Sequence, residues 1–579
     1  MGFSRAPEDR PTPPEVYGYR PYMLTFLACL GSWMFGYNNG VIGGVLVLPS
    51  FTHAFSLPPT GTPAYNSIIE NIVSLFQIGG LIGAMATFPG MKFWGRRVAL
   101  AISAGVYTVG AAVQTFSYGK LSMMYAGRFI TGLGAGGTTV VVPLYIAELS
   151  PPSIRGTLVG IYEINNQLSG LLGYWCNYIV NEYLPPISTR QYQIPLAMQL
   201  IPSSLLILAS LLFLPESPRF LIKKGRADKA RKVLAYIRHL PCEHEYVNLE
   251  VEEIEEAIRR EENPNLNPNS HSNPDTDPVA GGAGGDRSKK GKWGLVGELW
   301  WKGNRGRVLI GICLMIGQNF TGINGVNFYT PTIFKSIGFS GTKVVLLASG
   351  MYAAVKTIAT IISLVFFIDR LGRRKLLITS SIGTCLSLWY IGAFITAKHV
   401  DLKVEQEKSV AGWVAIVCVY IYAASFSVAW NGVVWVYCAE IFPTRIKELA
   451  VCLTTAVQWI CQFTVARASP SMLTNLHGGF FFFFAACITI MGLFVYFFVP
   501  ETKGRTLEGM DEVFGSAYGE LVGGVVEFRG FQRERGVDLG RVKGGMVDVE
   551  AGRGRKEVGG DEITRVTTQT QQAVPMASL

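Results

Sequence analysis

The segment Gly306–Pro331, GRVLIGICLMIGQNFTGINGVNFYTP, begins as an apolar helix and then becomes rich in amides and glycines. Carboxamides are costly in hydrocarbon, so such side chains must face protein, water or a ligand. The glycines let a helix loosen, and loosened helices near the bilayer midplane are where transporters bind substrate. The alternative is a packing helix with glycine and asparagine at a helix–helix contact. The carboxamides stand at Gln318, Asn319, Asn324 and Asn327.

Two aromatic residues, Phe328 and Tyr329, follow these amides directly. Amides exchange hydrogen bonds with hydroxyls, and aromatic rings cover apolar C–H faces. If the segment binds a ligand, this combination favours a polyhydroxylated ring.

The composition of the whole chain is that of a membrane protein. Of 579 residues, 49% are hydrophobic and only 16% are charged, and the mean hydropathy is +0.29. A soluble domain carries about a quarter charged residues. We therefore expect an all-α membrane protein with about twelve transmembrane helices. The expected spans lie near residues 22–48, 67–90, 98–117, 121–143, 156–180, 193–214, 306–330, 343–368, 375–397, 410–438, 449–470 and 478–499.

The net charge of +10 is concentrated in short loops, at residues 92–97 and 370–375. Both loops fall on one side if the spans alternate, and basic short loops mark the cytoplasm. We therefore expect both termini to be cytoplasmic. We expect the protein to interact with the lipid bilayer and not with nucleic acid. The loop near 398–409 is charge-balanced, as fits the outer side.

The ten cysteines are scattered, without a C-x-x-C pair, so we expect neither a disulfide framework nor a metal site. A phosphate-binding loop is absent from the sequence, and no Ser/His/Asp set can be picked out. We therefore expect no enzyme activity and no cofactor.

Three signatures occur twice in the same order, about 280 residues apart. The paired segments are WGRR at 94–97 with LGRR at 371–374, AELSPPSIRG at 147–156 with AEIFPTRIK at 439–447, and PESPR at 215–219 with PETKGR at 500–505. This repetition predicts two six-helix halves, the architecture of alternating access, in which one half moves against the other around a central site.

The chain accordingly divides into five parts. We expect a cytoplasmic segment at 1–21, a six-helix half at 22–214 and a cytoplasmic linker at 215–305. A second six-helix half follows at 306–499, and a cytoplasmic tail at 500–579. The start of the linker has helical charge spacing. Its middle, near 262–292, and the tail lack apolar content, which predicts disorder.

These motifs resemble the sugar porter family of the major facilitator superfamily. The resemblance covers roughly 20–505, and its motifs include FGYNNGVIGG, GRFITGLGAGG, PLYIAELSPPSIRG, QNFTGIN and DRLGRR. The segments EDRPTPPEVYGYR, GIYEINNQLSGLLGYWCNY and WNGVVWVYCAEIF resemble, more narrowly, the fungal quinate permease branch.

The resemblance implies a substrate site and a pair of gating aromatics. The implied binding residues are Gln318, Asn319, Asn324, Trp435, Gln458, Trp459 and Gln462, and the aromatics are Phe328 and Tyr329. The family's fifth-span glutamine position holds Ile164, and Gln167, one turn further along the same face, is a candidate substitute. The tenth span has AWNGVVW where hexose carriers have a proline-rich segment, which argues against a hexose substrate.

The repeated charged loops are candidates for a cytoplasmic gate. Salt bridges there would hold the halves together when the site opens outward and break when it opens inward. The alternative is static surface pairs, each of which contributes little stability. The candidate gate residues are Arg96, Arg97, Arg155 and Glu148 in the first half, and Arg373, Arg374, Arg445, Glu440 and Asp369 in the second.

The resemblance also bears on proton coupling, because proton symporters of the family carry a first-span aspartate opposite a fourth-span arginine. Here Asn38 stands opposite Arg128, and an amide has no titratable proton near neutral pH. We therefore expect facilitated diffusion. Glu163 in the fifth span is the alternative proton site, or else a hydrogen-bonded structural acid.

Lys356 lies near the middle of the eighth span. A buried ammonium would pair with a carboxylate substrate such as quinate. A lysine bonded to neighbouring carbonyls, or one extending toward the membrane surface, is the alternative.

The leading hypothesis is a passive carrier of a monosaccharide or a quinate-like polyol in the plasma membrane. A proton-coupled symporter and a non-transporting nutrient sensor on the same scaffold remain alternatives. The sequence leaves open the substrate, the oligomeric state and the choice between plasma and vacuolar membrane.

Overall fold

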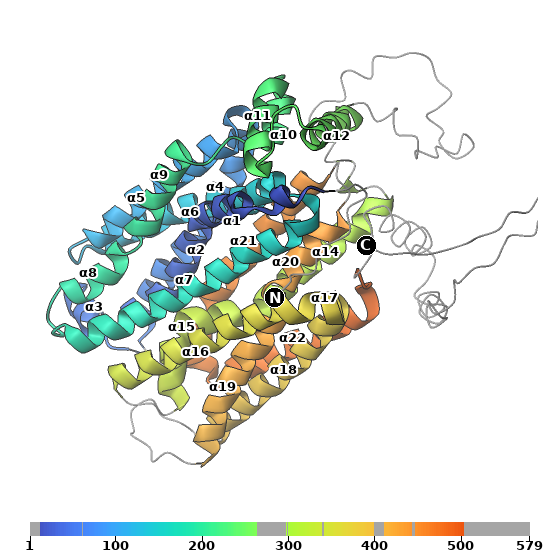
Figure 1. Cartoon of the computed structure of the whole chain (residues 1–579). Helices are drawn as coiled ribbons and strands as arrows, with labels where there is room; N and C mark the ends of the chain where they lie inside the picture. Colours follow the sequence, from blue (N-terminus) through green and yellow to red (C-terminus); the bar gives the residue numbers. More distant parts are fainter. Residues whose placement is uncertain are drawn as a thin grey trace, which may run out of the picture. The chain divides into compact units, whose positions relative to one another are not determined.

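The computed structural model describes residues 12–60, 62–262, 297, 299–300, 302–337, 341–398, 410–442 and 446–502. Every element in this part of the chain is helical (Figure 1), which confirms the all-α expectation. The middle of the linker, the loop near 398–409, Arg445 and the tail beyond Thr502 lie outside the described residues.

Six long membrane helices, several of them broken, come from each half. The first half contains α1 (Tyr19–Ala28) with α2 (Leu30–Val45), the short α3 (Pro49–Ala54), α4 (Pro63–Trp94), α5 (Arg96–Thr115), α6 (Leu121–Leu149), α7 (Arg155–Tyr183), and α8 (Arg190–Ala197) with α9 (Leu200–Leu212). The second contains α14 (Lys302–Phe320) with α15 (Ile323–Ile337), α16 (Thr342–Ile362) with η5 (Ser363–Phe367) and α17 (Ile368–Leu371), α18 (Arg373–Lys398), α19 (Val410–Val428) with α20 (Val433–Ile441), α21 (Lys447–Leu476) and α22 (Gly479–Phe498).

Ten helices in the described part are long and apolar enough to cross a membrane. The two remaining expected spans are α1 with α2 and α7. The first is divided at Cys29 into pieces of 10 and 16 residues. Helix α7 has 29 residues, but Glu163 and the amides that follow it lower its hydropathy.

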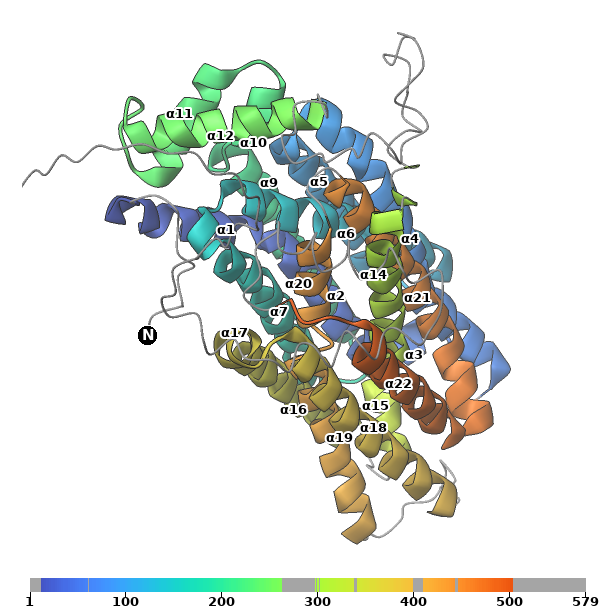
Figure 2. The same cartoon turned by 90° about the vertical axis from the view of Figure 1, so that its right-hand side faces the viewer.

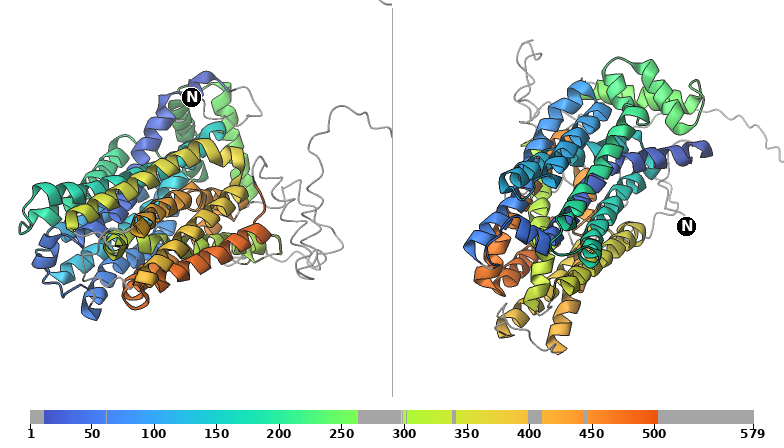
Figure 3. Two further views of the ribbon diagram at one scale, coloured as in Figure 1. Left: turned by 90° about the horizontal axis from the view of Figure 1, so that it is seen from below. Right: turned by 90° about the vertical axis from the view of Figure 1, so that its left-hand side faces the viewer.

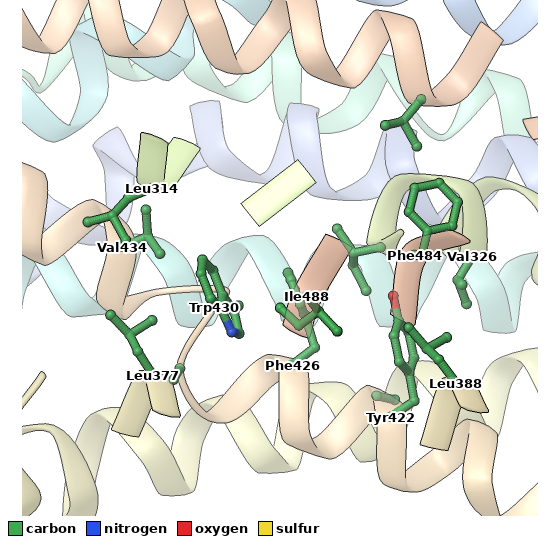
Figure 4. Close-up of a cluster of buried hydrophobic side chains, with 14 of the residues drawn as sticks. Leu314, Val326, Leu377, Leu388, Tyr422, Phe426, Trp430, Val434, Phe484 and Ile488 are labelled. Atoms are coloured by element: carbon green, nitrogen blue, oxygen red, sulfur yellow. The ribbon is translucent and has the colours of Figure 1, made fainter. Parts of the chain in front are cut away.

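The two halves repeat the same neighbour relations. Helix α2 packs on α7 as α14 packs on α21, α5 packs on α6 as α18 packs on α19, and α5 packs on α9 as α18 packs on α22. Each half has its own apolar core. Figure 4 shows part of the second core, where Phe426 of α19, Trp430 of the segment after α19 and Ile488 of α22 come together.

The halves meet along three helix pairs: α4 with α21, α7 with α16, and α2 with α15. Figure 3 shows α16 running beside α7, so that the fifth and eighth spans form one side of the interface between the halves. The interface therefore contains the polar segment of α7.

The start of the linker forms α10 (Pro218–Lys223), α11 (Ala227–Arg238) and α12 (Glu245–Glu262) at one end of the bundle, which we call the linker end (Figure 2). Arg238 is fully buried there. Its Nε and Nη2 donate to Glu250 at 3.0 and 2.5 Å, and its Nη1 donates to the carbonyl oxygen of Leu149 at 2.8 Å. This arginine therefore attaches α11 and α12 to the end of α6.

Candidate functional site

The expected loosening of the seventh span occurs between α14 and α15. Gly322 has φ +85°, and a Cβ there would lie 2.8 Å from the Phe484 ring. An L-residue would be both strained and obstructed at this position. The break places the amides of Gln318 and Asn324 on separate helices.

Gln318 connects this break to a second one between α19 and α20. Its Nε2 donates to the carbonyl oxygens of Trp430 and Asn431 at 2.8 and 3.1 Å. Its Oε1 is buried and has no hydrogen-bond partner. The Nε2 atom of Gln318 therefore stabilises the break in the tenth span, while its Oε1 atom remains an unsatisfied acceptor.

Asn319 and Asn324 are buried and bonded to each other across the same break. Asn324 Nδ2 donates to Asn319 Oδ1 at 2.6 Å, and Asn319 Nδ2 donates to the Met315 carbonyl oxygen at 2.8 Å. In this structure their hydrogen bonds hold the two helix pieces together.

Glu163 lies about 12 Å along α7 from Arg155 and is bonded to both halves. Its Oε1 accepts from Gln167 Nε2 at 2.8 Å and from Asn431 Nδ2, in the second half, at 2.8 Å. Asn166 Nδ2 adds a longer bond of 3.3 Å. Gln167 thus acts as a donor to Glu163 and lies at the interface between the halves, where its carbonyl oxygen accepts from Thr357 at 3.3 Å.

Lys356 faces the same interface from α16. Its Nζ donates to Asn327 Oδ1 at 3.2 Å, and Tyr352 OH donates to the same oxygen at 2.9 Å. The carbonyl oxygen of Asn327 accepts from Tyr174 OH, in the first half, at 2.6 Å. Lys356 and Asn327 remain partly accessible despite their depth in the bundle.

The two expected gating aromatics are both buried where α15 meets the first half. Tyr329 OH donates to the Ala466 carbonyl oxygen at 3.2 Å. Phe328 belongs to an apolar cluster with Val41 and Ile42 of α2. Tyr329 also departs from helical geometry, with φ −113° and ψ 18°, two residues before Pro331. These rings lie between the halves.

The eleventh span contributes a tryptophan to the first half. The Trp459 ring lies 5.6 Å from that of Phe35 and 6.1 Å from that of Phe76. A Cβ at Gly80 would come within 2.4 Å of this indole, so only glycine leaves room for it. Of the other implied binding residues, Gln462 is buried, and Gln458 and Trp435 are partly accessible.

The expected proximity of Asn38 and Arg128 is present. Arg128 is fully buried and lies over the Phe76 ring. Its Nη1 donates to Asn38 Oδ1 at 2.9 Å, and its Nε donates to the Ile72 carbonyl oxygen at 2.9 Å. Its Nη2 has no partner. Asn38 Nδ2 in turn donates to Gln199 Oε1 at 3.2 Å. The position next to the guanidinium is therefore occupied by a neutral side chain.

The charged loop after α4 forms what we call the first corner, made by Gly95, Arg96, Arg97, Glu148 and Glu216. Arg96 Nη2 pairs with Glu148 Oε1 at 2.8 Å. The backbone N–H groups of Arg96 and Arg97 donate to Glu216 Oε1 at 2.8 and 3.3 Å. Gly95 has φ +93°, and a Cβ there would lie 2.4 Å from Glu216 Oε2.

The second corner repeats this arrangement with Gly372, Arg373, Arg374, Glu440 and Glu501. Arg373 Nη2 pairs with Glu440 Oε1 at 2.9 Å. The N–H groups of Arg373 and Arg374 donate to Glu501 at 2.8 and 3.1 Å. Gly372 has φ +85°. Each corner pair joins helices of one half.

The second arginine of each corner binds the last helix of its own half. Arg97 donates to the carbonyl oxygens of Ser210 and Leu211 at 2.6 and 2.5 Å, and Arg374 donates to that of Tyr496. Among the other candidate gate residues, Arg155 is exposed at the start of α7 and Asp369 lies in α17.

The end of the bundle away from the linker contains polar contacts between the halves that the sequence did not reveal. Ser471 Oγ donates to Glu70 Oε1 at 2.5 Å, and Arg467 lies 3.6 Å from the other oxygen of that carboxylate. Asn66 donates to Thr474 at 3.0 Å. These residues join α4 to α21.

Sequence reasoning also missed Asn431, which connects Glu163 and Gln318. The signal was present in AWNGVVW, where an asparagine and a glycine interrupt an apolar span. The partner of Asn431 is about 270 residues away along the chain, and no local pattern reveals such a pairing.

Comparisons with known proteins agree with this geometry. The sequence profile of the family described as "Sugar (and other) transporter" matches residues 24–514. A protein of Neosartorya fischeri named probable quinate permease is 37% identical over 520 residues, covering 88% of this chain and 90% of that protein. A protein of the same name from Aspergillus niger is 36% identical over 550 residues, covering 94% and 98%.

Among solved structures, the proton:xylose symporter XylE bound to 6-bromo-6-deoxy-D-glucose superposes with a TM-score of 0.67 and 25% identity, covering 85% of this chain and 99% of XylE. A partially occluded inward-open form of XylE from E. coli gives a TM-score of 0.66. The major facilitator fold expected from the repeated motifs is thereby confirmed.

Proposed function

Because the chain belongs to the sugar (and other) transporter family, we propose that it carries a monosaccharide or a quinate-like polyol across a membrane by alternating access. The observation that carries this proposal is the meeting of polar side chains from both halves deep in the bundle. Glu163 of α7 and Asn431 of the second half bond at 2.8 Å. Tyr174 and the Asn327 backbone bond at 2.6 Å.

These contacts suit a site that opens by relative movement of the halves. Each joins one half to the other with an amide or a hydroxyl as the donor, and such donors exchange hydrogen bonds with a polyol at little cost. Gln318 Oε1 is a buried acceptor without a partner, and a substrate hydroxyl would satisfy it. The relatives named probable quinate permease favour a cyclic polyol acid.

The mode of transport in this proposal is facilitated diffusion. Asn38 occupies the place beside Arg128 and accepts from it at 2.9 Å. An amide keeps its protons throughout the physiological pH range, so this pair cannot bind and release a proton during the cycle.

A proton-coupled cycle is the second candidate, since Glu163 is a buried carboxylate whose described partners are all neutral amides. Such a group can accept a proton without losing an ion pair. The solved relative XylE is named a proton:xylose symporter.

For the membrane we propose the plasma membrane, with the linker end in the cytoplasm. The basic corner loops lie at that end, as the preference of short basic loops for the cytoplasm requires.

The test is uptake of labelled glucose and labelled quinate by a yeast strain that lacks its own hexose carriers, with and without a protonophore. Uptake of at least one compound, insensitive to the protonophore, supports a facilitator. Sensitivity to the protonophore moves the proton to Glu163 and contradicts facilitated diffusion. If neither compound enters while the protein is confirmed at the cell surface, the proposed carrier function is wrong for these substrates.

The variant Asn38→Asp sharpens this test, because it restores a titratable carboxyl beside Arg128. We expect its uptake to become sensitive to the protonophore, whereas Asn38→Ser, a neutral control, should leave uptake insensitive. Insensitivity of both variants would show that a carboxyl at this position is insufficient for coupling.

A further inference from the structure

The ammonium of Lys356 has no ion-pair partner within 4.0 Å among the described residues. It lies about 21 Å along α16 from Thr342, at the depth of the membrane interior. Its described hydrogen bond goes to a neutral acceptor, Asn327 Oδ1, which Tyr352 OH also uses. A lysine ammonium has three donors, and an ammonium at this depth is costly unless an anion or several acceptors surround it.

A carboxylate of opposite charge stands on the facing helix. Glu163 of α7 is buried, and α7 runs beside α16. Thr357, which follows Lys356, donates to the carbonyl oxygen of Gln167 at 3.3 Å, and Gln167 in turn donates to Glu163. Among the described residues, however, no ion pair within 4.0 Å joins Glu163 to Lys356.

The amides around Glu163 explain why the two charges stay apart. Gln167 and Asn431 each donate to Glu163 Oε1 at 2.8 Å, so this carboxylate is satisfied without the lysine. Lys356 is partly accessible and keeps donors available for another anion. The arrangement presents a cation to the interface between the halves, while the carboxylate on the facing helix is held by other groups.

Arg128, another cation deep in the bundle, is not available in this way. It is fully buried, and its Nη1 and Nε already donate to Asn38 and to the Ile72 carbonyl oxygen, although Nη2 lacks a partner. It also lies on α6 rather than on α7 or α16.

We propose that Lys356 binds the carboxylate of an anionic cyclic polyol, and that Glu163, on the facing helix, is the opposing charge that limits the strength of this binding. This inference rests on the proposed carrier function and assigns the residue that selects an acidic polyol over a neutral one. Lys356 is then a specificity-determining residue, and Glu163 acts on the substrate through it as a positioning residue.

The experiment compares two ring polyols of similar size in the yeast uptake assay: quinate, which carries a carboxylate, and myo-inositol, which is neutral. In Lys356→Met, we expect the half-saturation concentration for quinate to rise at least about tenfold, as for loss of one partner of a buried charge pair. The half-saturation concentration for a neutral ring should change much less in the same variant. Lys356→Arg retains the charge and should keep a measurable preference for quinate.

Lys335→Met is the matched control, because Lys335 is a partly buried lysine further along α15 that belongs to no part of the proposed site. It should transport quinate as the wild type does. Surface abundance of each variant, measured by labelling, separates loss of binding from loss of folded protein.

Glu163→Gln gives an independent readout. Removal of the opposing charge should lower the half-saturation concentration for quinate severalfold relative to that for a neutral ring. An equal effect on both compounds would assign Glu163 a purely structural role and contradict its part in the proposal.

The outcomes separate this inference from the function on which it rests. If the wild type takes up only the neutral ring, or if Lys356→Met has wild-type parameters for quinate, the inference is wrong and the carrier function stands. If the wild type takes up neither ring nor glucose, both are wrong.

Discussion

The two corners of the molecule are near copies, whereas the middle of the bundle is not. Arg96 pairs with Glu148 at 2.8 Å in the first half, and Arg373 pairs with Glu440 at 2.9 Å in the second. At mid-depth the first half presents a carboxylate, Glu163, and the second a cation, Lys356.

This contrast shows what the duplication retained. A corner must join a loop to the ends of neighbouring helices, a task that is the same in each half, so the same glycine, arginines and carboxylates serve twice. A small asymmetric substrate is contacted differently by the two halves, so the residues that meet it have no reason to match. Substrate preference should therefore depend on the middle, and stability on the corners.

The largest expected effect comes from the first corner. Arg96→Met leaves Glu148, whose side chain is only 5% exposed, without its cation, and breaking a buried pair in this way costs about 3–5 kcal/mol. Arg373→Met should cost less, because Glu440 is 30% exposed and also accepts from Thr502 at 2.8 Å. Thermal unfolding of the purified variants in detergent measures both.

The same two variants sharpen the comparison with the middle. Neither should change the ratio of quinate to neutral-ring uptake in the protein that reaches the membrane. Equal losses of stability in the two variants would contradict the expected difference between the two ion pairs. A changed substrate ratio in either variant would show that the corners also influence substrate preference.

An intermediate effect is expected from Asn431→Ala at the interface between the halves. It removes a hydrogen bond to the Glu163 carboxylate, a type of contact that contributes about 1.5–3 kcal/mol. Transport kinetics should change by roughly tenfold or more, while the melting temperature should fall less than in Arg96→Met. Asn431→Gln, which keeps the amide, is the control; a loss in Asn431→Ala seen only as lower protein abundance would contradict a role in transport.

The smallest effect is expected at the end away from the linker. Glu70→Gln weakens the contact with Arg467, whose side chain is 41% exposed, and pairs of this kind contribute about 1 kcal/mol or less. Because the contact joins α4 to α21 where the halves meet, its loss should favour opening at this end without destabilising the fold. Labelling of a cysteine introduced at Ile69, a buried residue of α4 beside Glu70, would report the opening, and unchanged labelling would remove this contact from the gate.

Much of the fold follows from the sequence because its signals are local. Apolar runs indicate the spans, and the repeated GRR, AE and PE motifs indicate the two halves. The break at Gly322 is visible in the glycines around the amides. Local signals of this kind need no knowledge of which helices become neighbours.

The candidate site is only partly visible in the sequence, because its contacts are between distant residues. The amides Gln318 and Asn324 can be singled out from their cost in a membrane, but their bonds to backbone and to Asn319 could not. The bonds from Asn431 to Glu163 and from Arg467 toward Glu70 depend on how α7 and α4 pack against the other half.

The most direct test of the account is counterflow in proteoliposomes. Vesicles containing the purified protein and loaded with unlabelled quinate are diluted into a trace of labelled quinate at equal pH on both sides. A facilitator that alternates around one site predicts transient accumulation of label above its external concentration, unaffected by a protonophore and abolished by empty loading. Label that never exceeds the external concentration would contradict alternating access with this substrate.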